Sequence, residues 1–168
     1  DSYPVTIIGI IFVATFVLGS FVIFGFLLGR INQFMQDYYE EKHLGFKGTN
    51  FSDHAVILGW NNSAQSVLEQ LIGVGRRTAI VTDVKDDVDL IKESYSPKQV
   101  FVLYADFSNL EILKKVNIEN SSMVFVNLKD DTTKLVHILN MKKVYGNCKF
   151  VVSLDNADLK NTFQTAGV

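Results

Sequence analysis

HAVILGWNNSA, residues 54–64, is a short, mostly apolar run that ends at a glycine and continues into polar residues. Residues 54–58 lack the alternation of polar and apolar residues that is typical of a strand with one solvent-exposed face. They therefore predict a strand that is covered on both faces. Gly59 supplies a tight turn, and the polar residues after it are typical of a helix start. The stretch therefore predicts the first strand, turn and helix of a parallel α/β sheet.

The same pattern occurs four more times toward the C-terminus. Short β-branched runs alternate with helical stretches, an order that produces a parallel sheet with helices on both faces. Five such units predict an α/β fold with a Rossmann-like, doubly wound parallel sheet. The predicted strands are 55–58, 78–82, 100–104, 123–128 and 150–154, and the predicted helices are 63–72, 88–93, 110–116, 132–144 and 157–165.

The loop after the first predicted strand is the first candidate for ligand binding, because such sheets bind ligands at the carboxyl ends of their strands. Its residues are Gly59, Trp60, Asn61, Asn62 and Ser63. A dinucleotide fingerprint has three spaced glycines; Gly59 matches the first, Asn61 replaces the second and an alanine replaces the third. Two interpretations stay open: binding of a phosphate group, or a helix cap made by Asn62 or Ser63.

Acidic residues follow the second and third predicted strands. Asp83 lies 24 residues after Gly59, near the spacing of about 20 at which a carboxylate binds a nucleotide ribose. Asp106 follows the third strand, so Gly59, Asp83 and Asp106 are expected at one edge of the sheet. Together they predict an adenine nucleotide such as NAD or ADP as ligand, although Asp83 as a helix N-cap is an equally good interpretation.

A calcium site is the second ligand hypothesis. Asp106 and Asp155 follow the third and fifth predicted strands, and their oxygens are of the kind that calcium prefers. Two carboxylates supply only part of a shell of about six to eight oxygens. Capping and solvation explain either residue alone.

Catalysis has little support in the sequence. His43 lies between the predicted helix and sheet, His54 opens a strand, and His137 lies within a helix. None has a cysteine or serine spaced for nucleophilic catalysis. We therefore predict that the chain is not an enzyme.

The N-terminal segment predicts a single transmembrane helix. No charged residue or histidine occurs from Ser2 to Gly29, and the apolar run of 24 residues from Val5 to Leu28 would cover roughly 36 Å as a helix, against about 30 Å of hydrocarbon. A signal peptide is a poorer interpretation, because residues 1–4 carry no lysine or arginine. The helical spacing continues through Ile31 to Tyr38, so the helix is expected to extend into water.

Two glycines and turn-forming residues then interrupt the helical pattern. We expect three parts: 1–42, a transmembrane helix with its extension; 43–52, a linker; and 53–168, an α/β domain that is truncated at its C-terminal end. Residues 30–168 contain 16 basic and 17 acidic residues. This balance does not predict a positively charged surface for nucleic-acid binding. The single cysteine, Cys148, is compatible with a reducing cytosol.

Two segments resemble one family of proteins. DSYPVT, residues 1–6, resembles the stretch that follows the selectivity filter of potassium channels, and Gly9 lies where their inner helices often have glycine. HAVILGW, residues 54–60, together with Tyr104-Ala105-Asp106 and LEILKK, residues 110–115, resembles the RCK domain, a Trk-type nucleotide-binding regulator of prokaryotic potassium channels.

This resemblance implies a homotetramer in the cell membrane, in contact with lipid, with potassium as the transported ion and the RCK N-lobe in the cytoplasm. Four such domains would form a gating ring that pulls on the inner helices when a small molecule or ion binds. The chain alone is expected neither to select nor to conduct ions. The carboxylates of calcium-gated members match Asp106 and Asp155, but a third falls at Ser153, which weakens calcium here.

The resemblance also places the gating hinge at Ser20, beside Gly19, with Gly25 following. Close helix packing in the membrane is the alternative explanation of these glycines. For the whole chain two further readings stay open. One is a membrane-tethered nucleotide-binding regulator or enzyme that forms no pore, and the other is a purely structural oligomerisation module.

Overall fold

The computed structural model describes residues 6–146 and 148–168. The chain divides into two compact units, a helical unit that ends at Glu40 and an α/β unit from Glu41 to Val168. Most of the DSYPVT motif, residues 1–5, lies outside the described residues.

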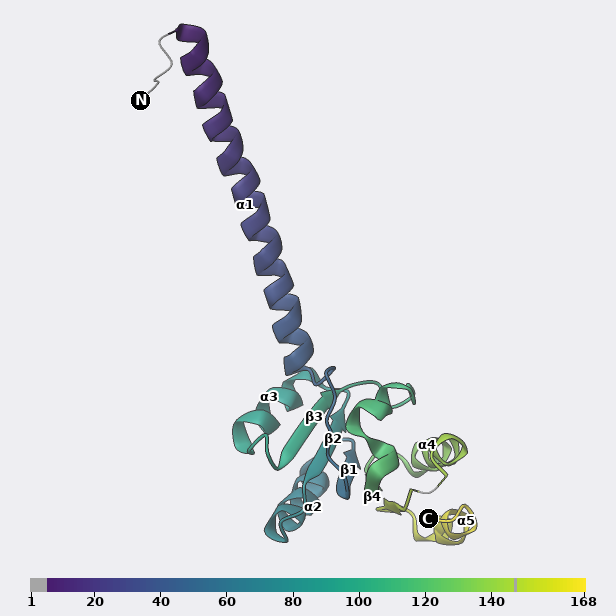
Figure 1. Ribbon diagram of the computed structural model, residues 1–168. Coiled ribbons are helices and arrows are strands. Elements are labelled where there is room, and N and C mark those ends of the chain that lie inside the picture. The colour runs from purple at the N-terminus through teal and green to yellow at the C-terminus, as the bar shows by residue number, and fades with distance from the viewer. Residues whose placement is uncertain (1–5, 147) are drawn as a thin grey trace. The chain divides into compact units, whose positions relative to one another are not determined.

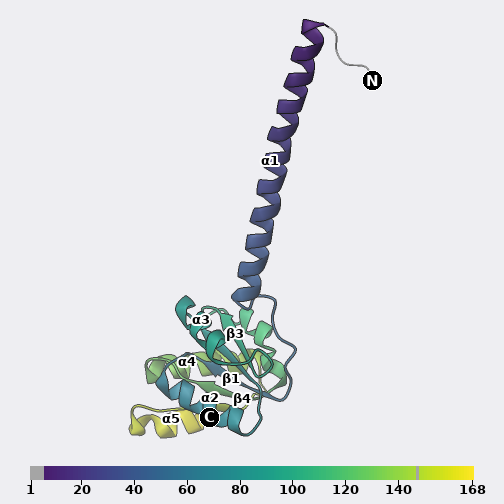
Figure 2. The same ribbon diagram turned by 90° about the vertical axis from the view of Figure 1, so that its left-hand side faces the viewer.

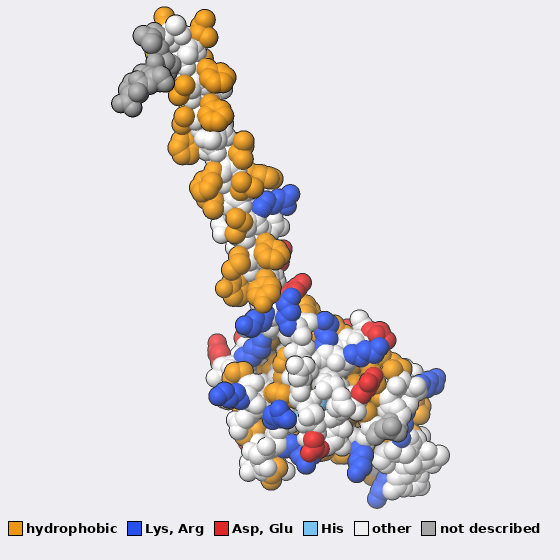
Figure 3. All heavy atoms as spheres, viewed as in Figure 1, with side chains coloured by type: hydrophobic (Ala, Val, Ile, Leu, Met, Phe, Trp, Pro, Cys, Tyr) orange, Lys and Arg blue, Asp and Glu red, His pale blue; other side chains and the backbone are white. Residues whose placement is uncertain are grey.

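The helical unit is one continuous helix, α1 (Ile7–His43), whose last three residues belong to the α/β unit. Its surface is almost entirely hydrophobic over the first six turns (Figure 3), and none of its residues is buried. By length and composition this helix is able to cross a membrane, and it is the one such helix among the described residues. A hydrophobic helix that buries nothing in its own chain requires either lipid or other protein around it.

The α/β unit is built on a five-stranded parallel sheet with the order β3-β2-β1-β4-β5 (Figure 1). The doubly wound order agrees with the prediction from sequence. Every residue of β1 and β2 is buried, as expected for strands with helices over both faces. The strands are β1 (His54–Leu58), β2 (Thr78–Thr82), β3 (Val100–Tyr104), β4 (Ser121–Val126) and β5 (Phe150–Val152).

Successive residues of each strand face opposite layers of the core. Ile57 and Ile80 pack with α2 (Asn62–Gly73) and α3 (Lys85–Ser94), whereas Leu58 and Val81 pack with α4 (Asp131–Val144) and α5 (Lys160–Thr165). The two layers can be followed in Figures 1 and 2. The sheet thus has one hydrophobic core on each face.

The connection from β3 to β4 differs from the expected α-helix over 110–116. It contains two short 3₁₀ helices, η1 (Ile112–Val116) and η2 (Ile118–Asn120). Asn117 separates them in a left-handed conformation, and no side chain caps the start of η1. In a segment this short, without a capping side chain, the hydrogen bonds of an α-helix do not offset the unfavourable free energy of nucleating it.

The segment between α1 and β1 lies along the outer edge of β3. The backbone N–H of Tyr104 donates to the carbonyl of Leu44, and the N–H of Thr49 donates to Lys115. A Cβ on Gly45 would lie 2.3 Å from the carbonyl oxygen of Val102, so only glycine fits there. This segment, residues 44–49, partly covers an edge strand that would otherwise be open, and we call it the edge segment.

Candidate functional site

The carboxyl ends of β1, β2 and β4 lie level at one edge of the sheet. Leu58 is opposite Val81 on one side and opposite Val126 on the other. Backbone hydrogen bonds continue one residue beyond the strands, from Gly59 N–H to the Val81 carbonyl and from Asn127 N–H to the Leu58 carbonyl. The strand order reverses between β1 and β4, which is where doubly wound sheets bind ligands.

Gly59 is required by the backbone at this edge. Its φ is +89°, and a Cβ would come within 2.4 Å of the carbonyl oxygen of Asn127. Both observations exclude any L side chain without rearrangement. Gly59 therefore has the role of the first glycine of a dinucleotide turn, which brings the β1–α2 loop close to the β4–α4 loop.

The helix after this turn is capped by Asn61, not by Asn62 or Ser63. The Asn61 side chain accepts a hydrogen bond of 3.0 Å from the Ala64 N–H, and its own backbone is extended. Its side-chain oxygen also accepts a 2.6 Å bond from the amide of Asn127, which is buried at the end of β4. The residue at the second-glycine position thus orders the loop, because it connects the first turn of α2 to the neighbouring strand end.

The other loop residues have distinct places. Trp60 is half-buried against the core layer of α2 and α3, whereas Asn62 and Ser63 are exposed on the first turn of α2. The amino terminus of this helix, with its orphan N–H groups, faces the edge where a phosphate group would bind. The sequence alone did not single out Asn127, since a lone asparagine after a strand carries no distinctive pattern.

Asp83 follows β2 directly and is exposed. It does not cap α3, whose N-cap residue is Val84, without a side-chain cap bond. The local turn is held instead by Thr82, whose hydroxyl accepts from the Val84 N–H and donates to Asp87. The capping explanation of Asp83 therefore does not apply, and Asp83 lies one residue beyond β2, at the same edge of the sheet as Gly59.

Asp106 follows β3, and its carboxylate accepts the Ser108 N–H at 2.8 Å. This bond, with a second one to the Ser108 side chain, lowers the pKa of Asp106. β3 and β5 are the two outer strands of the sheet, and four strand spacings separate them by about 19 Å. Asp106 and Asp155 therefore do not lie together, and no group of three or more His, Cys, Asp or Glu side chains within residues 6–146 and 148–168 could hold a metal ion.

Asp155 has an internal cation as its partner. The Lys134 ammonium donates to Asp131 at 2.9 Å, to Asp155 at 3.0 Å and to the Ser153 carbonyl at 2.8 Å. Burial alone lowers the pKa of Lys134, but the two carboxylates raise it above its ordinary value. Asp131 also accepts the backbone N–H groups that follow β5, so this cluster fixes the β5–α5 connection to α4.

The residues predicted to gate a pore lie within an unbroken helix. A Cβ on Gly19 or Gly25 would meet nothing within 4 Å, and Ser20 donates its hydroxyl to the Val17 carbonyl at 2.7 Å. All three positions are thus regular α1 residues whose role depends on what surrounds the helix.

The fold and its turn define a Rossmann-like domain of the type that binds nucleotides at the β1–β4 switch point. The TrkA-N domain family matches residues 55–168, and the chain belongs to this family. This confirms the Trk-type part of the resemblance noted in the sequence.

Solved structures of similar fold include both isolated domains and channels. The TrkA-N domain of the inner membrane protein ybaL from Escherichia coli matches 71% of this chain and 86% of its own length, at 12% identity and a TM-score of 0.63. The GsuK channel bound to NAD matches all of this chain at 19% identity and a TM-score of 0.62, and GsuK bound to ADP does so at 18% and 0.64. This chain spans 31% and 45% of those two GsuK chains, and 25% of the GsuK RCK domain structure.

Proposed function

We propose that this chain is the pore-lining and ligand-sensing part of a tetrameric potassium channel, and that an adenine nucleotide at the strand ends controls its gate. The observation that carries the proposal is the presence, in one chain, of a helix long and apolar enough for a membrane and a TrkA-N domain. The GsuK channel structures match the chain over both parts. The helix would lie in the cell membrane and the domain in the cytoplasm.

The nucleotide is supported by the geometry around Gly59. The β1–α2 turn, the exposed start of α2 and the Asp83 carboxylate supply a turn, a phosphate site and a ribose acceptor at one edge. The similar GsuK channel has been solved bound to NAD and bound to ADP. Calcium has weaker support, because Asp106 and Asp155 lie at opposite edges of the sheet and Asp155 is paired with Lys134.

Assembly into a gating ring is supported by exposed aliphatic side chains on α4. Val136 and Leu139, three residues apart on the helix, are 50% and 43% exposed, and Val144 at its end is 49% exposed. Neighbouring exposed aliphatic side chains are typical of protein contacts. In this proposal α4 contacts a neighbouring domain, while α1 contacts neighbouring helices and lipid.

Coupling is supported by the edge segment. It is held to β3 and η1 by backbone hydrogen bonds and by the close approach of Gly45 to Val102. A displacement of the domain would therefore be passed to the end of α1 rather than absorbed by loose chain. The domain acts here as a sensor and not as an enzyme.

The test is potassium flux through the protein that carries this chain, reconstituted in liposomes, with NAD and with ADP. The proposal expects nucleotide-dependent flux from a tetramer, established by native mass measurement. Nucleotide binding without flux from a smaller assembly would favour a membrane-tethered regulator without a pore. Assembly with neither binding nor flux would leave a structural module.

A further inference from the structure

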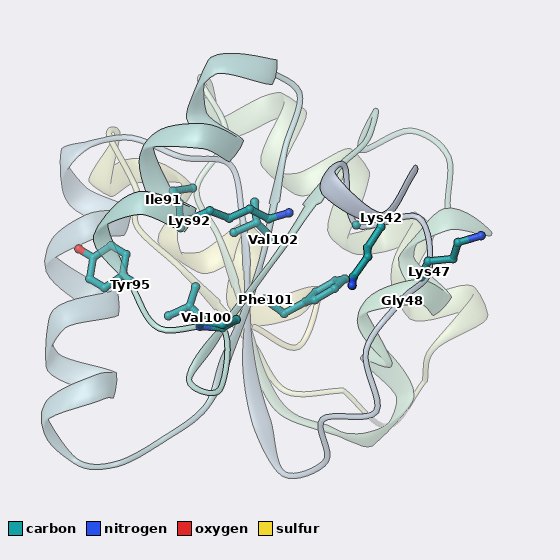
Figure 4. A pocket seen from close by; sticks show the side chains of 11 residues that line it. Lys42, Lys47, Gly48, Ile91, Lys92, Tyr95, Val100, Phe101 and Val102 are labelled. Atoms are coloured by element: carbon teal, nitrogen blue, oxygen red, sulfur yellow. The ribbon is translucent and has the colours of Figure 1, made fainter. Parts of the chain in front are cut away.

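A cavity of about 410 Å³ lies between the edge segment, α3 and the outer edge of β3 (Figure 4). Its volume is within the range of about 300–1,000 Å³ typical of small-molecule sites. It lies beside the first residues of β3 and not at the strand ends around Gly59, so it is separate from the nucleotide site. Its lining residues are Lys42, Gly45, Lys47, Gly48, Ile91, Lys92, Tyr95, Pro97, Val100, Phe101 and Val102.

The walls and the rim of this cavity differ in character. Aliphatic and aromatic side chains from α3 and β3 line the cavity, together with three lysines. The Lys47 amine is directed away from the cavity, whereas the amines of Lys42 and Lys92 are directed into it. Figure 4 shows the Lys42 side chain directed toward the ring of Phe101, and Lys92 directed across the cavity toward Val102. An apolar space with a cationic rim fits a molecule with an apolar body and a negative group.

Acidic groups near the rim only partly offset these amines. Lys47 donates to Glu41 at 2.8 Å, and Asp89 is paired with His43 at 2.5 Å. Lys92 donates to a neutral carbonyl, that of His43, and burial lowers its pKa. The nearby Asp89 carboxylate partly offsets this effect of burial, so an anion in the cavity would be a second opposite charge and would accept a charge-assisted hydrogen bond from Lys92.

We propose that this cavity binds an amphipathic organic anion, with an apolar aromatic or aliphatic body among Ile91, Val100 and Phe101 and one carboxylate or phosphate group at Lys42 and Lys92. A nucleotide fits less well, because a base needs polar partners at its edge and these walls are apolar. Since the edge segment forms one wall, the bound anion would hold that segment against β3. The cavity is then a second control site, independent of nucleotide.

The test uses 2-naphthoate on the full chain in lipid nanodiscs, followed by saturation-transfer NMR, with empty nanodiscs as the reference. The neutral 2-naphthalenemethanol and the cationic 2-naphthylmethylammonium are matched probes. Replacing the two amines directed into the cavity, Lys42→Gln with Lys92→Gln, should weaken naphthoate binding by about threefold to tenfold. Lys98→Gln with Glu93→Gln leaves the cavity lining intact and should change nothing, and Lys98→Gln with Lys129→Gln, also outside the lining, is the control for the loss of two positive charges.

A second readout is amide hydrogen exchange at Tyr104, whose N–H bonds to Leu44 of the edge segment. Naphthoate should slow this exchange, and ADP should not displace the probe. The proposal is overturned if naphthoate fails to bind at millimolar concentration, or if the three probes bind equally. It is also overturned if the control variants weaken binding as much as the lysine pair, if ADP displaces the probe, or if exchange at Tyr104 is unaffected.

Discussion

Glycines in the two units of this protein differ in how closely the rest of the chain approaches them. In the α/β unit, a Cβ on Gly45 or Gly59 would lie within 2.4 Å of a backbone carbonyl oxygen of the same chain. In α1, a Cβ on Gly19 or Gly25 would meet nothing within 4 Å. The domain's own backbone therefore requires these two glycines, whereas none of the described residues requires those of the helix.

The requirement for Gly45 and Gly59 thus arises within one chain, whereas a requirement for the glycines of α1 can arise only in an assembly or a membrane. The domain buries β1 and β2 completely, and the close approaches of Gly45 and Gly59 are to its own backbone, so substitutions of these two glycines should affect folding of the isolated chain. α1 exposes its hydrophobic side chains along its length. Any requirement for glycine there must come from bending or from neighbouring helices in a membrane.

The largest effect is expected from Gly59→Ala. The substitution combines a strained positive φ with overlap against Asn127, and should lower the free energy of unfolding by about 3–5 kcal/mol. The measurement is chemical denaturation of the full chain, followed by the fluorescence of Trp60 beside the mutated loop. Nucleotide binding should be lost in the variant.

Gly75→Ala is the matched control. Gly75 also has a positive φ, +73°, but a Cβ there would meet nothing within 4 Å. Only strain of about 1–2 kcal/mol is expected, with unchanged nucleotide binding. Equal destabilisation by the two substitutions would mean that the close approach to Asn127 is not important.

The contrast between the two units also explains what could be predicted from sequence. The runs at Thr78–Thr82 and Val100–Tyr104 predicted β2 and β3 with their observed bounds, because continuous β-branched segments have few alternatives between turns. The unbroken uncharged stretch predicted α1, because an apolar run long enough to span a membrane favours a continuous helix. The local pattern at 110–116 was less informative, since a 3₁₀ helix forms there instead of an α-helix.

Predictions that depended on strand order were less successful. Asp106 and Asp155 were placed together because each follows a strand, but β3 and β5 lie at opposite edges. The cap at Asn61 depends on its contact with Asn127, 66 residues away. The partner of Asp155 is Lys134 on α4, and no spacing rule connects a helix lysine with a strand end.

The next effect in size concerns ligand binding at the strand ends. Asp83→Ala should weaken adenine nucleotide binding by about 10- to 100-fold, the equivalent of one hydrogen bond to a charged group. Asp86→Ala, on the first turn of α3, is the control and should leave affinity unchanged. Calorimetry with NAD and ADP measures both. Equal affinity of Asp83→Ala and the unmodified chain would remove Asp83 from the site.

A smaller effect is expected from the pH dependence of the domain. His54 is fully buried and donates through Nε2 to the Val116 carbonyl, and its Nδ1 has no partner among residues 6–146 and 148–168. Burial lowers the pKa of His54, so the unfolded chain binds its proton first as pH falls. Stability should therefore decrease below about pH 6.5, by at most about 1.4 kcal/mol per pH unit.

Denaturation curves between pH 7 and pH 5.5 test this, since carboxyl groups contribute mainly below that window. His54→Gln should lower stability overall but flatten its pH dependence. An unchanged slope in the variant would assign the dependence to another group.

The smallest effect on the chain itself is expected from Gly19→Ala and Gly25→Ala, because neither Cβ meets an obstacle and alanine favours the helix by about 1 kcal/mol. Their effect should appear only in the assembled protein. If either glycine permits bending of the inner helices, alanine should shift the resting open probability in single-channel recordings without altering ion selectivity. If the glycines serve close packing, alanine should instead reduce the amount of tetramer in native mass spectra. Gly29→Ala, in an equally open position, controls for general stiffening of α1. Normal assembly with unaltered gating in both variants would contradict both roles, and would show that the open space around these glycines persists in the membrane.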